Sequence, residues 1–180
     1  MIAQLIGVIA TAFLLLSFQA KTKKKLYLLQ ATFSAIFIVH FALLHQPVGA
    51  AMQVVGLLRC LFLFFDTPFT NSKTALVILS VITVGLAAFT FDGFISLFPP
   101  AVLFISTFIM WFCDIKAIKK CQFFMFSPLW IIYDITAGSY SGIINELLAM
   151  SSVVIYWVRS RNSETSQVKI KEEELATESN

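Results

Sequence analysis

Four ionisable side chains lie inside otherwise apolar stretches of this sequence, where a charge is costly: Arg59, His40, Asp134 and Glu146. An arginine fork binds planar oxyanions through parallel hydrogen bonds, so a functional Arg59 favours an anionic or carboxylate-bearing ligand. Burial favours the neutral form of a carboxyl group, which lets it exchange a proton near neutral pH. Asp134, Glu146 and His40 are therefore candidate proton-coupling residues.

The elements that must position these groups are long apolar helices. The chain has 180 residues, of which 58% are hydrophobic and 19 are phenylalanine, and its mean hydropathy is +0.85. A soluble domain of this size could not bury so much apolar surface, whereas about 20 apolar residues span a bilayer. The sequence therefore predicts an all-α integral membrane protein with seven transmembrane helices, at Ile2–Phe18, Leu26–Leu44, Val48–Phe65, Thr74–Phe91, Ile95–Phe112, Cys121–Gly138 and Ser141–Val158.

The basic residues predict how these helices are oriented. Of the 13 lysines and arginines, all except Arg59 follow the first, third, fifth or seventh apolar stretch, as in the segment KTKKK at residues 21–25. By the positive-inside rule these segments face the cytoplasm, so the N-terminus lies outside and the C-terminus inside. Short basic clusters beside apolar helices indicate contact with membrane lipids, and we expect no nucleic-acid partner.

Helix rise predicts two levels of polar groups. At 1.5 Å per residue, His40, Gln53, Asp134 and Glu146 share one layer about 6–8 Å below the outer surface. Arg59 lies deeper, about 17 Å below the outer end of its helix. Alternatives stay open: the layer can reach the lipid headgroups or form hydrogen bonds across helices, His40 can be an interface residue, and Arg59 can be structural.

The two halves of the chain are similar when shifted by 93 residues without gaps. The two halves agree in charge placement, helix length and loop length. The matched pairs are Lys23 with Lys116, Ser34 with Ser127, Phe37 with Trp130, His40 with Tyr133, Gly49 with Gly142, and Gln53 with Glu146. This predicts a 3+1+3 arrangement within a membrane domain at 1–159. Repeat one is 1–66, a linker helix is 67–93 and repeat two is 94–159, with a flexible cytoplasmic tail or frayed helix at 160–180. One linker helix makes the two triple-helix repeats parallel, as in some transporters.

Helical periodicity predicts which faces meet between the repeats. Met52, Gly56 and Arg59 follow the i, i+4, i+7 spacing of one helix face. The shift of 93 residues maps this face onto Asn145, Ala149 and Ser152. We expect the two faces to lie on opposite sides of a central cavity, with Arg59 below Asn145. Pro99, Pro100 and Pro128 predict kinks, which serve either as hinges or as static bends.

The segment PLWIIYDITAGSYSGIINELLAM resembles the sixth-to-seventh helix region of SWEET sugar transporters. Its Trp130, Tyr133 and Asn145 stand at the positions of the W-x-x-Y and Asn of that region, and Gln19 resembles the end of a PQ-loop motif. The chain departs from the pattern at Met52, the counterpart of Asn145, and at Asp134, where a small residue is expected. Over residues 1–159 it is most similar to the YgjV family of bacterial inner-membrane proteins. The resemblance implies a SWEET-like transporter fold in that membrane.

Together these features predict a small-molecule transporter or facilitator that works by alternating access, with its substrate undetermined. The expected substrate-binding residues are Asn145, Trp130, Arg59, Tyr133 and Met52. No nucleophile–base set, zinc-ligand spacing or phosphate-binding loop is present, so we expect no enzyme, metal or cofactor. The alternative is a non-transporting receptor, accessory subunit or lipid-binding scaffold. The expected partners are membrane lipids and a small solute, and a homo-oligomer stays open.

Overall fold

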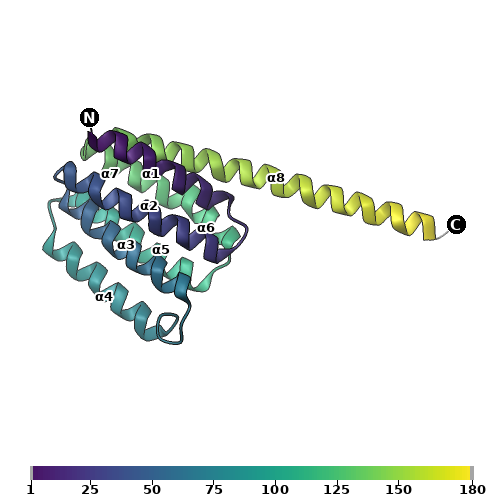
Figure 1. Ribbon diagram of the computed structural model, residues 1–180, viewed down its shortest axis with the longest axis horizontal. Helices are drawn as coiled ribbons and strands as arrows, with labels where there is room; N and C mark the ends of the chain where they lie inside the picture. Colours follow the sequence, from purple (N-terminus) through teal and green to yellow (C-terminus); the bar gives the residue numbers. More distant parts are fainter. Residues whose placement is uncertain (1, 179–180) are drawn as a thin grey trace.

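The protein is a bundle of α-helices, seen in a computed structural model that describes the backbone of residues 2–178 and the side chains of residues 2–161 (Figure 1). No strand occurs in that part of the chain, which confirms the all-α prediction. The helices are α1 Ile2–Gln19, α2 Lys23–Leu43, α3 Pro47–Phe65, α4 Lys73–Phe89, the 3₁₀-helix η1 Phe94–Leu97, α5 Phe98–Phe112, α6 Ile115–Cys121, the π-helix η2 Gln122–Phe126, α7 Ser127–Thr136 and α8 Tyr140–Glu178.

Several helices are long and apolar enough to cross a membrane. Five segments meet both criteria among the described residues: α1, α2, α3, η1 with α5, and the first part of α8, at 140–161. The apolar helix α4 is shorter, at 17 residues. α6, η2 and α7 follow one another without a break over residues 115–136. The predicted class of membrane protein is thus confirmed, and the predicted count of seven depends on α4 and this composite helix.

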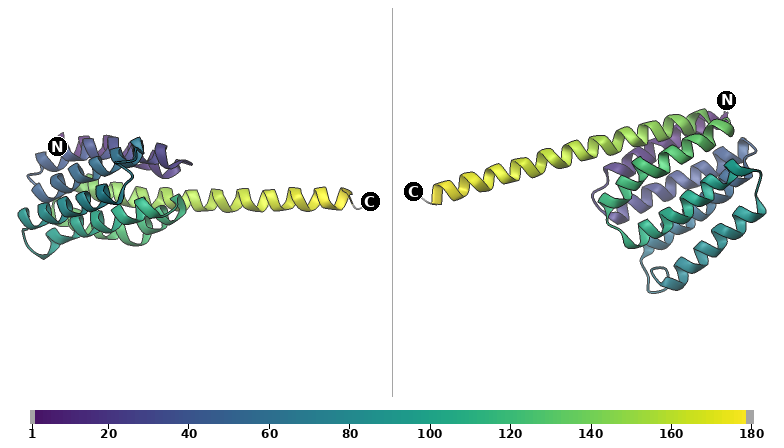
Figure 2. Two further views of the ribbon diagram at one scale, coloured as in Figure 1. Left: turned by 90° about the horizontal axis from the view of Figure 1, so that it is seen from below. Right: turned by 180° about the vertical axis from the view of Figure 1, so that it is seen from behind.

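Six helical segments form a ring. α1 packs on α2 and α2 on α3, while α5 packs on α7 and α7 on α8. The two groups meet twice, because α1 packs against α8 and α3 against α5. α4 packs against α3 and α5 from outside this ring, and it lies at the edge of the bundle in Figures 1 and 2.

The turns after α2 and after α7 have the same hydrogen bonds at a shift of 93 residues. Each turn contains one residue with a positive φ, His45 at 55° and Gly138 at 65°. Such a residue ends a helix in a left-handed cap and satisfies its last carbonyls. The matched bonds are Leu44 N to His40 O and Ala137 N to Tyr133 O, His45 N to Ala42 O and Gly138 N to Ile135 O, and Gln46 N to Phe41 O and Ser139 N to Asp134 O.

A glycine follows each of these turns and lets the two neighbouring helices approach closely. A Cβ at Gly49 would lie less than 3.0 Å from the ring of Phe41. At the equivalent Gly142, a Cβ would lie less than 3.0 Å from the carboxyl group of Asp134. Phe41 and Asp134 are themselves 93 residues apart, so both halves pack the second helix on the third in the same way.

The π-helix η2 contains one additional residue. α2 has 21 residues, whereas 115–136 has 22. The N-caps Thr22 and Asp114 differ by 92 positions, and the C-caps Leu44 and Ala137 differ by 93. The gap-free alignment predicted from the sequence therefore holds only after η2. A π turn absorbs a one-residue insertion without breaking the helix, and such turns are frequent at functional sites.

The prolines and the tail complete the fold. Pro99 and Pro100 lie in the first turn of α5, where a proline costs no hydrogen bond, so they start a helix rather than kink one. Pro128 directly follows η2. The backbone of the predicted tail continues α8 as far as Glu178, beyond the bundle (Figure 1). Residues 179–180 and the side chains from residue 162 lie outside the described part.

Candidate functional site

A cavity lies inside the ring, with about 80 Å³ of space open to water. This volume holds a few water molecules or a solute of comparable size. The cavity is lined from α1, α2, α3, α5, α6, η2, α7 and α8, so both halves of the chain form its wall. Five predicted site residues are in the lining: Arg59, Met52, Trp130, Asp134 and Glu146. Tyr133, Asn145 and His40 are buried beside the cavity and are absent from its lining.

The internal repeat gives this cavity a pseudo-symmetric wall. After η2 the equivalent lining residues are 93 positions apart, and before it they are 92 apart, as the helix caps require. Two of the equivalent pairs in the lining are aromatic and two are polar. The pairs are Phe33 with Phe126, Phe37 with Trp130, Gln53 with Glu146, and Gln30 with Gln122.

Arg59 faces the cavity from α3 and is 8% exposed. Its Nη1 donates a hydrogen bond to Ser106 Oγ on α5, and its Nε has no partner. Among the side chains that the structure describes, no carboxylate forms an ion pair with it. Met52 and Gly56 lie on the same helix face, as their spacing predicted. A buried guanidinium with an unused donor is available to an anion that enters the cavity.

The equivalent face of α8 packs against α1 instead of the cavity. Ala149 is fully buried, and Ser152 accepts a hydrogen bond from Gln19 Nε2 of α1 at 2.7 Å. Because adjacent residues point about 100° apart on a helix, only one of Asn145 and Glu146 can face the cavity, and it is Glu146. Asn145 therefore does not lie opposite Arg59 across the cavity as predicted, and Glu146 lines the cavity in its place.

Glu146 is surrounded by hydrogen-bond donors. Its Oε2 accepts from Gln122 Nε2 at 3.3 Å and its Oε1 from Asn145 Nδ2 at 3.3 Å. The hydroxyl of Ser127 forms a further hydrogen bond with it. Gln122 belongs to η2, so the inserted π turn supplies one of these donors. Asn145 thus acts on the carboxyl group rather than on the cavity.

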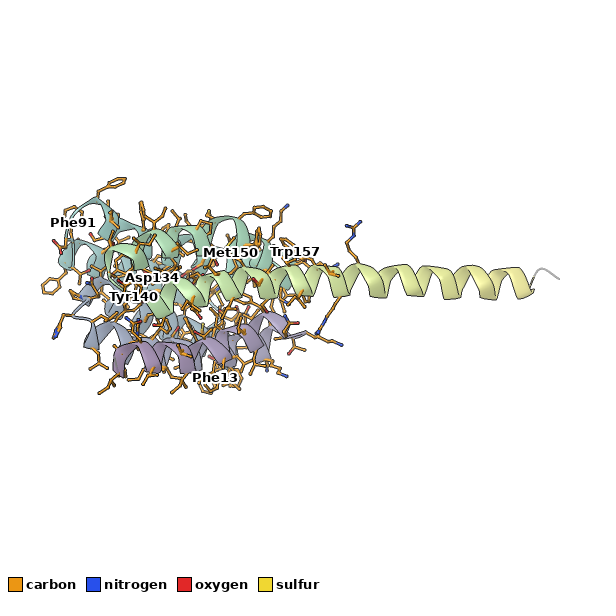
Figure 3. All side chains as sticks on the ribbon, turned by 90° about the horizontal axis from the view of Figure 1, so that it is seen from above. Phe13, Phe91, Asp134, Tyr140, Met150 and Trp157 are labelled. Atoms are coloured by element: carbon orange, nitrogen blue, oxygen red, sulfur yellow. The ribbon has the colours of Figure 1, made fainter. Side chains whose placement is uncertain are left out.

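Asp134 and His40 are joined through a shared hydroxyl. His40 Nε2 lies 2.8 Å from Ser139 Oγ, and His40 Nδ1 lies 2.8 Å from the carbonyl oxygen of Ala3. The side chain of Asp134 is hydrogen-bonded to the same Ser139, while its Oδ1 has no partner. His40 is fully buried at this junction of α1, α2 and the α7–α8 turn. Figure 3 labels Asp134 near Tyr140, where α8 begins.

Tyr133 forms a hydrogen bond outside the cavity. Its hydroxyl accepts a hydrogen bond from the backbone N of Gly49 at 3.0 Å. That bond ties α7 of the second half to the start of α3 in the first. The sequence predicts substrate contact for Tyr133, which stays a prediction.

Two further contacts join the halves at the opposite end of the bundle. Tyr27 Oη of α2 donates to the carbonyl of Met110 at the end of α5, at 3.0 Å. Lys119 Nζ of α6 donates to the carbonyl of Ala20 just after α1, at 3.1 Å, and lies 3.2 Å from the ring centre of Tyr156. Tyr27 and Lys119 are 92 positions apart, so these contacts, here called the Tyr27 clasp and the Lys119 clasp, are equivalent.

The charge pattern predicts that Lys119 is one of several cytoplasmic lysines, and in the structure it is fully buried. Its equivalence to Tyr27 becomes visible only when the shift before η2 is taken as 92. A second hollow, of about 400 Å³, lies at the other end, between the α2–α3 turn, the 92–96 loop and α7.

The surface of the bundle defines the class of this protein. Large apolar side chains are exposed along α1, α4 and α8, including Ile9 at 60%, Val81 at 64% and Ile155 at 48%. The interior instead holds Arg59, Asp134 and Glu146. Apolar residues outside and polar residues around a central cavity are what a lipid environment favours. The chain is a multi-pass helical membrane protein.

Comparison with known proteins gives the family. Residues 1–164 match the Imp-YgjV family, described as bacterial inner membrane protein. The chain is 26% identical over 160 residues to "Inner membrane protein YgjV" of Escherichia coli strain K12, covering 87% of this chain and 85% of that protein. The chain belongs to the Imp-YgjV family, a family of the bacterial inner membrane. No solved structure matches it.

Proposed function

We propose that this protein moves a small solute across the bacterial inner membrane by alternating access around the central cavity. The observation that carries the proposal is Arg59, a buried guanidinium with an unpaired Nε in a cavity between two equivalent halves. Transporters commonly bind their substrates between internal repeats near the middle of the membrane. The SWEET resemblance of Trp130, Tyr133 and Asn145 is in keeping with this function.

The contacts within the bundle support the 3+1+3 arrangement. α1, α2 and α3 form one triplet; α5, the composite helix 115–136 and α8 form the other; and α4 links them from outside. Equivalent turns, glycine contacts and clasps favour two repeats related by an axis along the membrane normal. With the basic segments in the cytoplasm, the N-terminus lies outside, the C-terminus inside, and the two clasps close the cytoplasmic end.

The two clasps also support alternating access. Each one joins the second helix of one repeat to the end of the first helix of the other. They hold the halves together below the cavity, while the hollow of about 400 Å³ lies above it. An inward-facing state requires both clasps to open.

A scaffold or receptor is the alternative function. It predicts that an internal partner uses the whole of the Arg59 side chain, and the free Nε argues against that. It gains support from the seam between α1 and α8. Near one end Ser141 N donates to Gln4 Oε1, and near the other Gln19 Nε2 donates to Ser152.

Uptake into proteoliposomes tests the proposed function. The purified protein is reconstituted and supplied with labelled organic acids, amino acids and sugars. We expect uptake of at least one solute, with a loss of at least about tenfold in Arg59→Met, because a buried ionic contact is worth several kcal/mol. Lys24→Gln removes an exposed charge and should leave uptake unchanged. Failure of every solute, with equal behaviour of the two variants, contradicts transport.

A further inference from the structure

We infer that the solute is a small carboxylate and that it binds together with one proton, which Glu146 receives. The inference rests on the proposed function only in that the bound carboxylate is the transported solute; its binding does not require transport. The hydrogen-bond capacity of Ser139 and the charges that line the cavity support it.

The chain of His40, Ser139 and Asp134 holds one proton that it cannot easily exchange. The carbonyl of Ala3 can only accept, so His40 Nδ1 carries a hydrogen. Ser139 Oγ also accepts from the backbone N of Gly142 at 3.2 Å. The hydroxyl therefore has one lone pair and one hydrogen left for His40 Nε2 and Asp134.

Only two arrangements satisfy all these atoms. Either neutral His40 accepts from Ser139 and protonated Asp134 donates to it, or protonated His40 donates to Ser139, which donates to ionised Asp134. Removing the proton leaves two acceptors for one hydrogen, and adding another leaves donors without acceptors. An unpaired buried polar group costs about 1–3 kcal/mol. The chain thus carries one proton and no net charge in both arrangements.

Glu146 is then the carboxyl group free to change its charge. Arg59 on α3 and Asp134 on α7 line the same cavity, His40 on α2 contacts Ser139, Tyr133 on α7 is bonded to Gly49, and Lys119 on α6 is held in its clasp. The amides of Gln122 and Asn145 each donate a hydrogen bond to one of its carboxyl oxygens. With the neutral chain beside it, ionised Glu146 balances Arg59 and the empty cavity has no net charge.

A carboxylate that binds Arg59 brings one negative charge into this balanced cavity. In surroundings of low dielectric constant an uncompensated charge is costly. Protonation of Glu146 restores neutrality, so one carboxylate takes up one proton. The planar oxygens of a carboxylate suit the guanidinium fork, and the volume of about 80 Å³ limits the solute to a few non-hydrogen atoms.

Binding to the purified full-length protein tests this inference without any transport. Acetate, propionate and pyruvate are titrated at about pH 6 to 8, where these acids are ionised, and binding is followed by thermal shift and by proton uptake with an indicator dye. We expect one proton per bound carboxylate and an apparent Kd that rises about tenfold per pH unit once Glu146 is ionised. Acetamide, propionamide and chloride should bind at least about tenfold more weakly.

Two matched variants separate the carboxyl groups. Glu146→Gln should bind carboxylates more tightly at high pH and lose both proton uptake and pH dependence, because Arg59 is no longer balanced. Asp134→Asn can still donate to Ser139 and should keep proton uptake. Arg59→Met should abolish binding, and Arg59→Lys, which keeps the charge but loses the fork, replaces it if Arg59→Met does not fold.

Equal binding of the amides or of chloride overturns the carboxylate class. Binding independent of pH, or proton uptake lost in Asp134→Asn but kept in Glu146→Gln, overturns the role of Glu146. Carboxylate binding with no uptake into proteoliposomes contradicts transport and leaves this inference standing. Uptake of a neutral solute with no carboxylate binding contradicts the inference and leaves transport standing.

Discussion

Gly142 has no side chain, and this is what allows Asp134 to lie against α8. The carboxyl group of Asp134 and the hydroxyl of Ser139 occupy the space that a Cβ would fill. A glycine in a helix is usually a cost in stability, but here it makes room for the polar chain that ends at His40. The absence of a side chain at this one residue thus lets the buried polar groups meet.

We predict that Gly142→Ala lowers the stability of the protein by about 1–3 kcal/mol, since the added carbon forces the surrounding atoms apart. Gly85→Ala is the matched control. No atom lies within 4 Å of a Cβ at Gly85 in α4, so this change should stabilise by about 0.5–1 kcal/mol. Thermal unfolding in detergent measures both. Equal stability of the two variants would show that Asp134 does not depend on Gly142.

Lys119 lies in α6, before the apolar stretch that begins at Cys121. Burial lowers the pKa of Lys119 from 10.5 to about 8. Between these values the unfolded chain binds a proton that the folded protein does not. Stability from this group therefore rises with pH from about 8 to 10.5, by at most about 1.4 kcal/mol per pH unit. Lys119→Met should lack this rise, measured as the difference in thermal unfolding between variant and wild type. A rise that persists in Lys119→Met contradicts the assignment.

At the scale of the helices, η2 is the element that distinguishes the two halves. Its additional residue places Gln122 in contact with both Ser127 and Glu146. The equivalent Gln30 lies in a regular helix and has no equivalent carboxylate, since Gln53 stands at the position of Glu146. The insertion and the acidic residue thus occur in the same repeat.

We predict that deletion of Phe124 is tolerated better than deletion of Phe108. Both side chains are exposed, but Phe124 lies in the π turn, so its loss turns η2 into regular α-helix and leaves α7 in register. Deletion of Phe108 rotates the end of α5 by about 100° and displaces Met110 from the Tyr27 clasp. Thermal unfolding should separate them by at least about 2 kcal/mol. A deletion of Phe124 as damaging as that of Phe108 would mean that η2 contains no spare residue.

At the scale of the whole molecule, the ring of six helical segments has two different seams. The α1–α8 seam carries several hydrogen bonds, whereas the α3–α5 seam carries the Arg59–Ser106 bond and is covered by α4. Although the two halves are similar in sequence, the two seams between them thus differ in their hydrogen bonds. The direction in which this molecule lies in the membrane follows from its charges.

We predict that Asp92 faces the outside and Lys24 the cytoplasm. In a background in which Cys60, Cys113 and Cys121 are replaced, Asp92→Cys should react with a membrane-impermeant maleimide in intact spheroplasts. Lys24→Cys should react only after the membrane is permeabilised. Both positions are exposed at loops or helix ends, so access alone does not distinguish them. The reverse pattern would invert the predicted topology.

Much of the fold could be predicted from the sequence, because hydropathy and charge act locally along the chain. Apolar length predicted the helices and the membrane, and the matched pairs predicted a repeat. The spacing of Met52, Gly56 and Arg59 gave one wall of the cavity. The π turn could not be predicted, because a single inserted residue leaves the hydrophobic pattern of 115–136 almost unchanged.

The sequence by itself determined that this protein is helical and belongs in a membrane. Only the tertiary structure decided that Glu146 rather than Asn145 lines the cavity, that Tyr133 bonds Gly49, and that Lys119 is buried in a clasp. The reason is that spacing defines the face of a helix but not the neighbour that covers it. That choice depends on how the helices rotate and pack, which contacts between distant residues fix.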